Sequence, residues 1–490
     1  MELLNKGKEN DNNSDNNSEG DSEGETEGII EEEEEEIEPP DTIEVSIAIS
    51  ALKNNKAPGS DNIPAELIKK GGKEIDTAIY RLITRIWQDE QMPKEWKTGI
   101  ICPIYKKGDK LKCQNYRGIT LLSNVYKIFT YILRKKLEKH YESTIGEYQG
   151  GFRTGRSTID QIFVVKRMAE KFREYGVDLH HLFIDFRTAY DSINRSMLYR
   201  ILAELGTHPK IIRLIKMTMS ESIGQVKIFG GITDPFPINT GLKQGDGLAP
   251  ILFNMALHWA VNKTQVDLQN TLLYKSIQIV GYADDLNIMG RTRNVIEDTY
   301  KELEQATAKM GLQVNREKTK YMVQKRDRNK NLAQGSRNAF EEVEKFKYLG
   351  VMITRDNDET IEIQGRITAA NKAYYALIGI MKSNHVHQKT KIKIYQTIIR
   401  SVLTYGSETW TMSKKIETML GVFERKVLRR IFGAVLDNQV WRIRYNQELY
   451  EKYKSMDLVT FIKLRRLEWA GHVYRMEECR IPRRVMEGRL

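Results

Sequence analysis

The stretch GYADDLNIMG, residues 281–290, places two adjacent carboxylates, Asp284 and Asp285, between apolar segments. The residues SIQIVGY precede the acids and LNIM follows them, a pattern that predicts two short strands joined by a turn. Asp is a common turn residue, so turn chemistry alone is one explanation for the pair. The neighbouring segments therefore decide whether this hairpin is structural or functional.

Strand-like and helix-like patterns alternate around the hairpin. In chain order, the predicted elements are the strand LHHLFIDF (179–186), a helical region at 196–219, the strand QVKIFGG (225–231), a Gly-rich loop opening a helix at 241–263, the hairpin, a helix at 294–310 and the short strands LQVN (312–315) and KYMVQ (320–324). Gly311 fits the C-cap of the last helix. This order is the βαββαβ pattern of a ferredoxin-like split βαβ fold, with the hairpin at its centre.

A third carboxylate, Asp185, ends the predicted strand LFID. In a split βαβ sheet this strand end and the hairpin tip can converge at one sheet edge. Clustered carboxylates repel one another unless a cation neutralises them. Mg²⁺ is a hard cation that binds through a few carboxylates and substrate phosphates, and two such ions about 3.5–4 Å apart support in-line phosphoryl transfer. We therefore interpret the hairpin tip as a support for metal ions.

The charge of the chain is unevenly distributed. Residues 1–40 hold 16 acidic residues and two lysines, so the net charge of +11 leaves +25 for the rest of the 490 residues. A body that basic favours a polyanionic partner such as nucleic acid, and a solvated basic surface is the alternative. The acidic segment has too few apolar residues to bury, and we expect it to be disordered.

Other features limit the class of protein. Cys102, Cys113 and Cys479 are too few and too scattered for a disulfide framework or a zinc site, and His472 has no metal-spaced partner. The N-terminus does not resemble a signal peptide, and no run approaches the roughly 20 apolar residues of a membrane span. We expect an intracellular protein that has no membrane partner.

Several motifs occur in a fixed order. FIDFRTAYD (183–191), GLKQGDGLAPILFN (241–254), YADD (282–285), GLQVNREKTK (311–320) and FKYLGVMIT (346–354) resemble motifs A to E of a reverse transcriptase. KAPGSDNIPAELIK (56–69), NYRGITLLS (115–123) and QGGFRTGRSTIDQI (149–162) resemble the finger motifs of non-LTR, LINE-type retrotransposon reverse transcriptases, and LTYGSETWTMSKK (403–415) and RRLEWAGHVYRM (465–476) resemble their thumb and C-terminal tail. The resemblance covers roughly residues 43–490.

The resemblance implies an α+β protein with the right-hand polymerase fold. The expected parts are a disordered acidic leader (1–40), fingers (41–178), a ferredoxin-like βαββαβ palm with motifs A to D (179–335), a primer-grip hairpin (336–360), and a helical basic thumb with a C-terminal extension (361–490).

The resemblance also assigns the catalytic groups. By motif position Asp185, Asp284 and Asp285 would be the catalytic acids that hold two Mg²⁺ ions, with Mn²⁺ as an alternative metal and Asp285 as the more indirect ligand. Lys318 in motif D would donate a proton to the pyrophosphate leaving group, with Lys320 as its rival. A solvated turn lysine is the other interpretation of either residue.

Nucleotide contacts follow in the same way. Tyr190 would pack under the incoming sugar and clash with a 2′-hydroxyl, or it is a core tyrosine. Gln244 and Gly245 would touch the nascent base pair and template, because glycine lets the backbone approach closely. Arg117 is the favoured triphosphate contact, and Lys106 and its neighbour Lys107 are either further phosphate contacts or plain surface charges.

Template and primer contacts complete the assignment. Arg153 would contact the template or nucleotide, or it serves structural pairing. Tyr348, Leu349 and Gly350 would form the turn that holds the primer end, and a plain hairpin is the alternative.

The implied activity is that of an RNA-directed DNA polymerase, a nucleotidyltransferase whose partners are an RNA template, a DNA primer, dNTP and the RNA–DNA duplex, in the nucleus, the cytoplasm or both. Rival interpretations are a catalytically inactive nucleic-acid-binding remnant, a host-retained derivative and a DNA-templated polymerase.

The motifs depart from the family at Thr188, Gly247 and Ala249, none of them a proposed metal ligand. No segment resembles an endonuclease, so we expect that this chain alone does not nick a target. The oligomeric state is not indicated.

Overall fold

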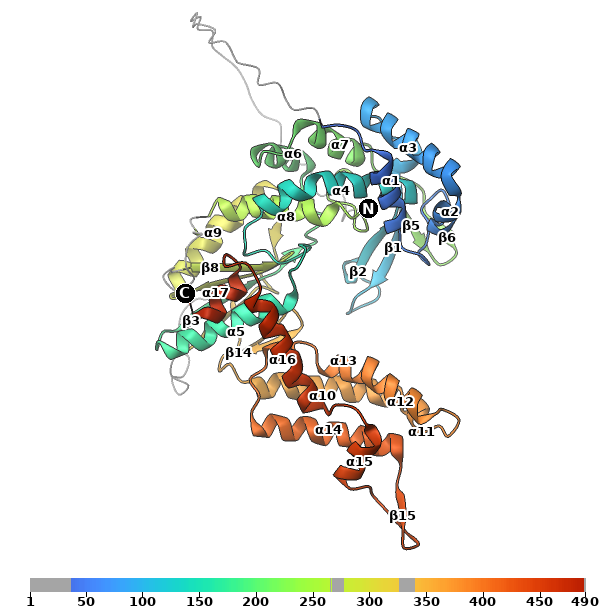
Figure 1. The fold of residues 1–490 in the computed structure, drawn as a ribbon. Helices are drawn as coiled ribbons and strands as arrows, with labels where there is room; N and C mark the ends of the chain where they lie inside the picture. The colour runs from blue at the N-terminus through green and yellow to red at the C-terminus, as the bar shows by residue number, and fades with distance from the viewer. Residues whose placement is uncertain (1–36, 265, 267–276, 326–339, 489–490) are drawn as a thin grey trace, which may run out of the picture. The chain divides into compact units, whose positions relative to one another are not determined.

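The computed structural model describes residues 37–264, 266, 277–325 and 340–488, and the chain divides into two compact units (Figure 1). Unit 1 comprises Met1–Ile145, Phe186–Lys263 and Leu303–Gln313, and unit 2 comprises Gly146–Asp185, Thr264–Glu302 and Val314–Leu490. Of the predicted acidic leader, residues 1–36 lie outside the described residues.

Unit 1 combines helices with a mixed sheet. Its helices are α1 (Thr42–Ala51), α2 (Ala65–Lys70), α3 (Gly72–Asp89), α4 (Asn124–Thr144), α6 (Arg195–Glu204), α7 (Pro209–Met219) and α8 (Ala249–Asn262), with short 3₁₀ turns η2 (Lys94–Lys97) and η3 (Cys113–Asn115). Its strands are β1 (Thr98–Tyr105), β2 (Tyr116–Leu121), β4 (Phe186–Arg187), β5 (Ile223–Ile228), β6 (Gly231–Ile232) and β7 (Phe236–Pro237). Strand β1 pairs antiparallel with β2 and parallel with β5.

The predicted helical region at 196–219 is two helices, α6 and α7. The break has a local cause, because Gly206 adopts a positive φ of 76° and Pro209 starts the next helix at a position that needs no N–H. Helix α8 is buried almost all round, as expected of a helix that is apolar on every face. No described helix is long and apolar enough to cross a bilayer.

Unit 2 contains a second sheet and the C-terminal helices. Its helices are α5 (Thr158–Glu174), α10 (Glu359–Ala376), α11 (Ile378–Lys382), α12 (Gln388–Ile394), the π-turn η4 (Tyr395–Ile399), α13 (Arg400–Leu403), the 3₁₀ turn η5 (Ser407–Thr409), α14 (Lys414–Phe432), α15 (Asn446–Tyr453), α16 (Leu458–Tyr474) and α17 (Ile481–Glu487). Its strands are β3 (Leu179–Ile184), β8 (Ile277–Tyr282), β9 (Asp285–Gly290), β11 (Lys320–Gln324), β12 (Glu341–Glu342), β13 (Lys345–Tyr348), β14 (Val351–Thr354), β15 (Val435–Asp437) and β16 (Val440–Arg442). Helix α9 (Arg293–Lys309) and strand β10 (Gln313–Val314) include points where the chain passes between the units.

The sheet of unit 2 has the strand order β12-β11-β3-β9-β8. Strand β3 pairs antiparallel with β11 on one side and with β9 on the other, and β9 pairs antiparallel with β8. The first strand of the motif therefore lies between the fourth and the third. The predicted ferredoxin-like arrangement and α+β class are confirmed.

The C-terminal helices form their own apolar core. Its fully buried members include Tyr395, Trp410 and Leu420, and α10 and α14 run through it (Figure 1). The predicted helical character of this region is confirmed, with one exception. The hairpin of β15 and β16 interrupts it, and its turn residues Asn438 and Gln439 both have positive φ, as a tight hairpin turn requires.

A buried carboxylate lies within this helical core. Glu424 on α14 is 0% exposed and accepts hydrogen bonds from the hydroxyls of Tyr395 (3.0 Å) and Tyr450 (3.1 Å) and from the N–H of Leu458 (2.9 Å). Burial raises the pKa of Glu424 above its usual value. The carboxylate thus joins α14 to η4, α15 and the start of α16.

We expect Glu424→Ala to lower the free energy of unfolding of this region by about 3 kcal/mol, because two buried donors and the half-buried Tyr450 hydroxyl lose their acceptor. Differential scanning calorimetry of the intact chain measures the change. Glu451→Ala on α15, an exposed position, is the matched control and should change stability by less than about 0.5 kcal/mol. Since the folded pKa of Glu424 is raised, its contribution to stability should be larger below the ordinary glutamate pKa and diminish as pH rises. Equal effects of the two substitutions would contradict this prediction.

Candidate active site

Three carboxylates meet at one end of the unit 2 sheet. Asp185 directly follows the last residue of β3, Asp284 lies in the turn after β8, and Asp285 opens β9. The register pairs Ile184 with Leu286 and Tyr282 with Asp285, so the three acids share this end of three neighbouring strands. The structure brings together the three acids that the sequence singled out.

The backbone of Asp185 is held by the turn before β11. Its carbonyl accepts a hydrogen bond from the N–H of Asn315 at 2.7 Å, and its N–H donates to the hydroxyl of Thr319 at 3.3 Å. The Nζ of Lys318, whose side chain is 62% exposed, lies 3.7 Å from Asp185 Oδ1. Lys320, the rival lysine, instead pairs with Glu341 on β12. Of the two lysines, Lys318 is therefore the one that lies beside Asp185.

The acids influence one another electrostatically. Loss of surrounding water, followed by the carboxylates of Asp284 and Asp185, raises the pKa of Asp285 to about 6, although part of the residue is exposed. Repulsion of this kind is relieved when a cation binds. Three carboxylates form an oxygen-only donor set of the kind that Mg²⁺ prefers. Across the ranges that the structure describes, no three His, Cys, Asp or Glu side chains are already arranged as a metal cluster.

The predicted nucleotide contacts fall in unit 1, around Asp191. The ring of Tyr190 stacks on Phe253, with ring centroids 4.7 Å apart, and is half-buried. The side chain of Gln244 donates to Asp191 Oδ1 at 2.8 Å, and its carbonyl accepts from the N–H of Thr120 at 2.7 Å. Burial raises the pKa of Asp191, and Gln244, Lys106 and Arg117 partly offset this. Tyr190, Gln244 and the two cations thus belong to one neighbourhood.

Gly245 has a backbone that only glycine adopts readily. Its φ is +123°, and a Cβ at this position would lie 2.5 Å from the carbonyl oxygen of Thr120 on β2. The loop therefore approaches β2 at a distance that excludes a side chain. Arg117 and Lys106, on or beside β2 and β1, are exposed.

The predicted primer-grip turn joins β13 and β14 in unit 2. Leu349 and Gly350 have φ values of 44° and 86°, and Tyr348 is 2% exposed. Strand β13 is tied to the acid-bearing sheet by Phe346, whose ring stacks on Phe183 of β3 with centroids 4.2 Å apart. Burial and then Asp285 raise the pKa of Tyr348.

Two side chains support this turn, Tyr405 from the turn between α13 and η5 and Arg366 from α10. The Tyr405 hydroxyl donates to the carbonyl of Leu349 at 2.9 Å, and the Arg366 guanidinium on α10 donates to the carbonyl of Gly350 and pairs with Glu362. A cavity of about 350 Å³ lies beside Tyr405. Its lining includes two guanidinium groups, those of Arg400 and Arg465.

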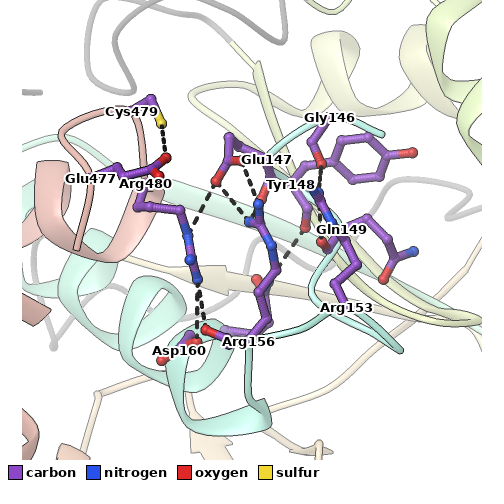
Figure 2. A network of polar contacts seen from close by, with 12 residues as sticks. Gly146, Glu147, Tyr148, Gln149, Arg153, Arg156, Asp160, Glu477, Cys479 and Arg480 are labelled. Carbon is purple, nitrogen blue, oxygen red and sulfur yellow. Dashed lines mark hydrogen bonds and ion pairs between the residues drawn. The ribbon is translucent and has the colours of Figure 1, made fainter. Parts of the chain in front are cut away.

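Arg153 is buried rather than solvent-facing. It is 7% exposed, and its guanidinium donates to the carbonyls of Gly146 (2.9 Å) and Gln149 (3.4 Å) in its own loop (Figure 2). This placement favours the structural pairing that the sequence left open. A template contact by Arg153 stays a prediction.

Sequence reasoning missed several supporting residues. Asp191 closes the quoted motif FRTAYD, yet nothing in its spacing marked it as the acceptor for Gln244. Arg195 gave no signal either, although it donates to the carbonyls of Gly241, Ile238 and Met219 and so fixes the loop before Gln244. Tyr405 lies inside a quoted thumb motif, but its partner Leu349 is 56 positions away.

Comparison with known proteins identifies a matching family and several similar relatives. A family model described as reverse transcriptase (RNA-dependent DNA polymerase) matches residues 104–353, slightly more than half of the chain. The RNA-directed DNA polymerase from mobile element jockey of Drosophila melanogaster is 25% identical over 419 residues, which cover 80% of this chain and 44% of that protein. The probable RNA-directed DNA polymerase from transposon X-element of the same species is 25% identical over 425 residues, covering 81% and 44%. The chain therefore spans less than half the length of these relatives.

Solved structures are also similar. A telomerase from Candida albicans, in complex with a fragment of telomeric RNA, has a TM-score of 0.43 at 13% identity and covers 80% of this chain and 69% of that chain.

Proposed function

Because the chain belongs to the reverse transcriptase (RNA-dependent DNA polymerase) family, we propose that it is the polymerase of a non-LTR retrotransposon. It would copy an RNA template by transferring a nucleotide from dNTP to the 3′-hydroxyl of a DNA primer. The predicted resemblance to polymerases of mobile elements is confirmed by the family match and by the two Drosophila relatives.

The convergence of Asp185, Asp284 and Asp285 at one sheet end carries this proposal. These carboxylates would hold two divalent ions, Mg²⁺ or Mn²⁺, which supply charge neutralisation and activation of a hydroxyl when bound. The acids would orient the reacting groups from the sheet, and Lys318 would donate a proton to the departing pyrophosphate, which its position 3.7 Å from Asp185 Oδ1 supports.

The remaining predicted contacts form two groups, one for the incoming dNTP and one for the primer. In unit 1, Tyr190, Gln244 and Gly245 would receive the sugar and base of the incoming dNTP, with Arg117 and Lys106 on its phosphates. In unit 2, the turn of Tyr348, Leu349 and Gly350 would hold the primer end, and the guanidinium groups beside Tyr405 suit a phosphate backbone. The boundaries of fingers, palm, primer grip and thumb given above belong to the same proposal.

Primer extension on poly(rA)/oligo(dT) tests the proposal. We expect incorporation of dTTP with Mg²⁺ or Mn²⁺, and stronger extension on the RNA template than on poly(dA)/oligo(dT). Absence of incorporation with both metals contradicts the proposal, and a strict preference for the DNA template would support a DNA-templated polymerase instead.

We expect Tyr190→Ala to relax the discrimination against ribonucleotides by about 10- to 100-fold, because the ring that would meet a 2′-hydroxyl is removed. The measurement is the ratio of the kcat/KM values for dTTP and UTP on the same primer–template. Tyr190→Phe keeps the ring and its stacking on Phe253, so its ratio should equal that of the wild type. An unchanged ratio in Tyr190→Ala would show that the tyrosine is only a core residue.

A further inference from the structure

A buried amide outside the catalytic set contacts the turn that carries the acids. Gln149, from the segment QGGFR, is 0% exposed. Its Oε1 accepts hydrogen bonds from the N–H of Ala283 at 2.7 Å and of Gly151 at 2.9 Å, and its Nε2 donates to the carbonyl of Ala283 at 3.1 Å. One side chain thus engages both backbone polar groups of the residue directly before Asp284.

Ala283 needs such support because of its backbone. It has a φ of 56°, in the left-handed region that residues with a Cβ disfavour, and it is 6% exposed. A left-handed residue persists where surrounding contacts determine it. This conformation of Ala283 reverses the chain so that Asp284 and Asp285 follow at the sheet end. The paired hydrogen bonds from Gln149 to the N–H and the carbonyl of Ala283 are contacts of this kind.

The segment that carries Gln149 is itself fixed against β8. The N–H of Gly150 donates to the carbonyl of Gly281 at 2.9 Å, and the N–H of Gly281 donates to the carbonyl of Tyr148 at 2.9 Å. Gly151 approaches so closely that a Cβ there would lie 2.3 Å from the nitrogen of Ala283. The segment and the turn therefore fit together without space for adjustment.

An ion-pair network secures the other side of the segment (Figure 2). Arg156 and Arg480 both pair with Glu147, the latter at 3.4 Å, and Arg480 also donates to the carbonyl of Gly155 at 3.1 Å. Arg480 precedes α17, which packs on α5. The carbonyl of Gln149 accepts from Arg153. The backbone that presents the Gln149 amide is thus immobilised on both sides.

We propose that Gln149 is a positioning residue for catalysis. Its side-chain amide holds the left-handed conformation of Ala283 and thereby aims Asp284 and Asp285 at the ions shared with Asp185. The proposal rests on the proposed function in that those acids are taken as the catalytic groups. A purely structural role would stabilise the fold but would leave the rate of the chemical step unchanged.

The test compares Gln149→Met with Gln278→Met in the full chain. Both substitutions remove a buried amide at similar volume, but within the described ranges the Gln278 side chain on β8 donates to the carbonyl of Ile279 in its own strand rather than to the turn that carries the acids. Two measurements are made: hydrogen exchange of the peptide containing Ala283, by mass spectrometry, and single-turnover incorporation of dTTP on poly(rA)/oligo(dT). The second yields the maximal rate, the dNTP affinity and the Mg²⁺ concentration at half-maximal rate.

For Gln149→Met we expect at least tenfold faster exchange at Ala283, a maximal rate lowered by about 10- to 100-fold, and a higher Mg²⁺ requirement, with dNTP affinity and duplex binding unchanged. Gln278→Met should match the wild type in these quantities. Should Gln149→Met fail to fold, Gln149→Glu replaces it, since the carboxylate retains the acceptor but not the donor to Ala283.

Unchanged exchange at Ala283 overturns the proposed contact, and faster exchange with an unchanged maximal rate overturns the positioning role. The exchange measurement does not require activity. A wild-type chain that incorporates no nucleotide therefore refutes the proposed function, and with it the catalytic role of Gln149, while exchange still decides on the contact itself.

Discussion

Replacing Asp284 with Asn is expected to reduce primer extension by about 10³-fold or more, since a ligand to divalent ions supplies several kcal/mol of charge stabilisation. The side chain keeps its shape, and Asp284 lies in the turn, outside the paired residues of β8 and β9. The fold and duplex binding should therefore survive. Asp185→Asn should behave alike, because Asp185 directly follows the neighbouring strand β3 at the same end of the sheet.

The measurement is single-nucleotide incorporation, accompanied by duplex affinity from fluorescence anisotropy. Asp298→Asn on α9 is the matched control, because Asp298 is exposed, belongs to the same unit and pairs only with Lys301 among the ion pairs described. It should retain wild-type activity. If Asp284→Asn extends primers at the wild-type rate, the metal-binding role of this cluster is wrong.

Gly245→Ala is expected to produce the second largest loss, about 10²-fold in kcat/KM. The added methyl group would lie 2.5 Å from the Thr120 carbonyl oxygen, and the backbone φ of +123° is unfavourable for any residue other than glycine. The loop must move, and it takes Gln244 away from Asp191. In the proposed function this loop positions the substrate, and a displacement of about 1 Å is sufficient for a loss of this size.

The same loop offers a matched control. Gly247→Ala adds the same methyl group two residues later, where no atom lies within 4 Å and the φ is not positive. It should retain activity within about twofold and keep its melting temperature. Equal losses in the two variants would show that flexibility of the loop, rather than close approach at Gly245, is what matters.

Strand and helix patterns predicted the elements of the acid-bearing sheet because its strands are apolar and separated by clear turn signals. Strand β3, the hairpin of β8 and β9, and helix α9 all occur where the apolar spacing placed them. The convergence of Asp185 with Asp284 was predictable for the same reason, since the βαββαβ order determines which strand ends are neighbours. The sequence did not predict the exposure of Lys318 or the pairing of Lys320 with Glu341, which only the structure shows.

The contacts that support the site were not predictable, because they join residues far apart in sequence through groups with no periodic signal. The amide of Gln149 meets Ala283 134 positions later, and a left-handed alanine has no sequence signature. Arg153 illustrates the converse difficulty. A cation in a motif indicates a phosphate contact as readily as a buried partner for carbonyl groups, and the 7% exposure of Arg153 favours the second role.

The stacking of Phe183 on Phe346 has a consequence for how a polymer is lengthened. These rings join the strand that Asp185 directly follows to the strand that leads into the Leu349–Gly350 turn, within one folded unit. In the proposed function, the spacing between the growing end and the reacting acids is then a constant of the protein. In each cycle of synthesis the nucleic acid would move by one nucleotide relative to these fixed groups. Slippage of the primer on the template would then originate in the duplex rather than in this pair of strands.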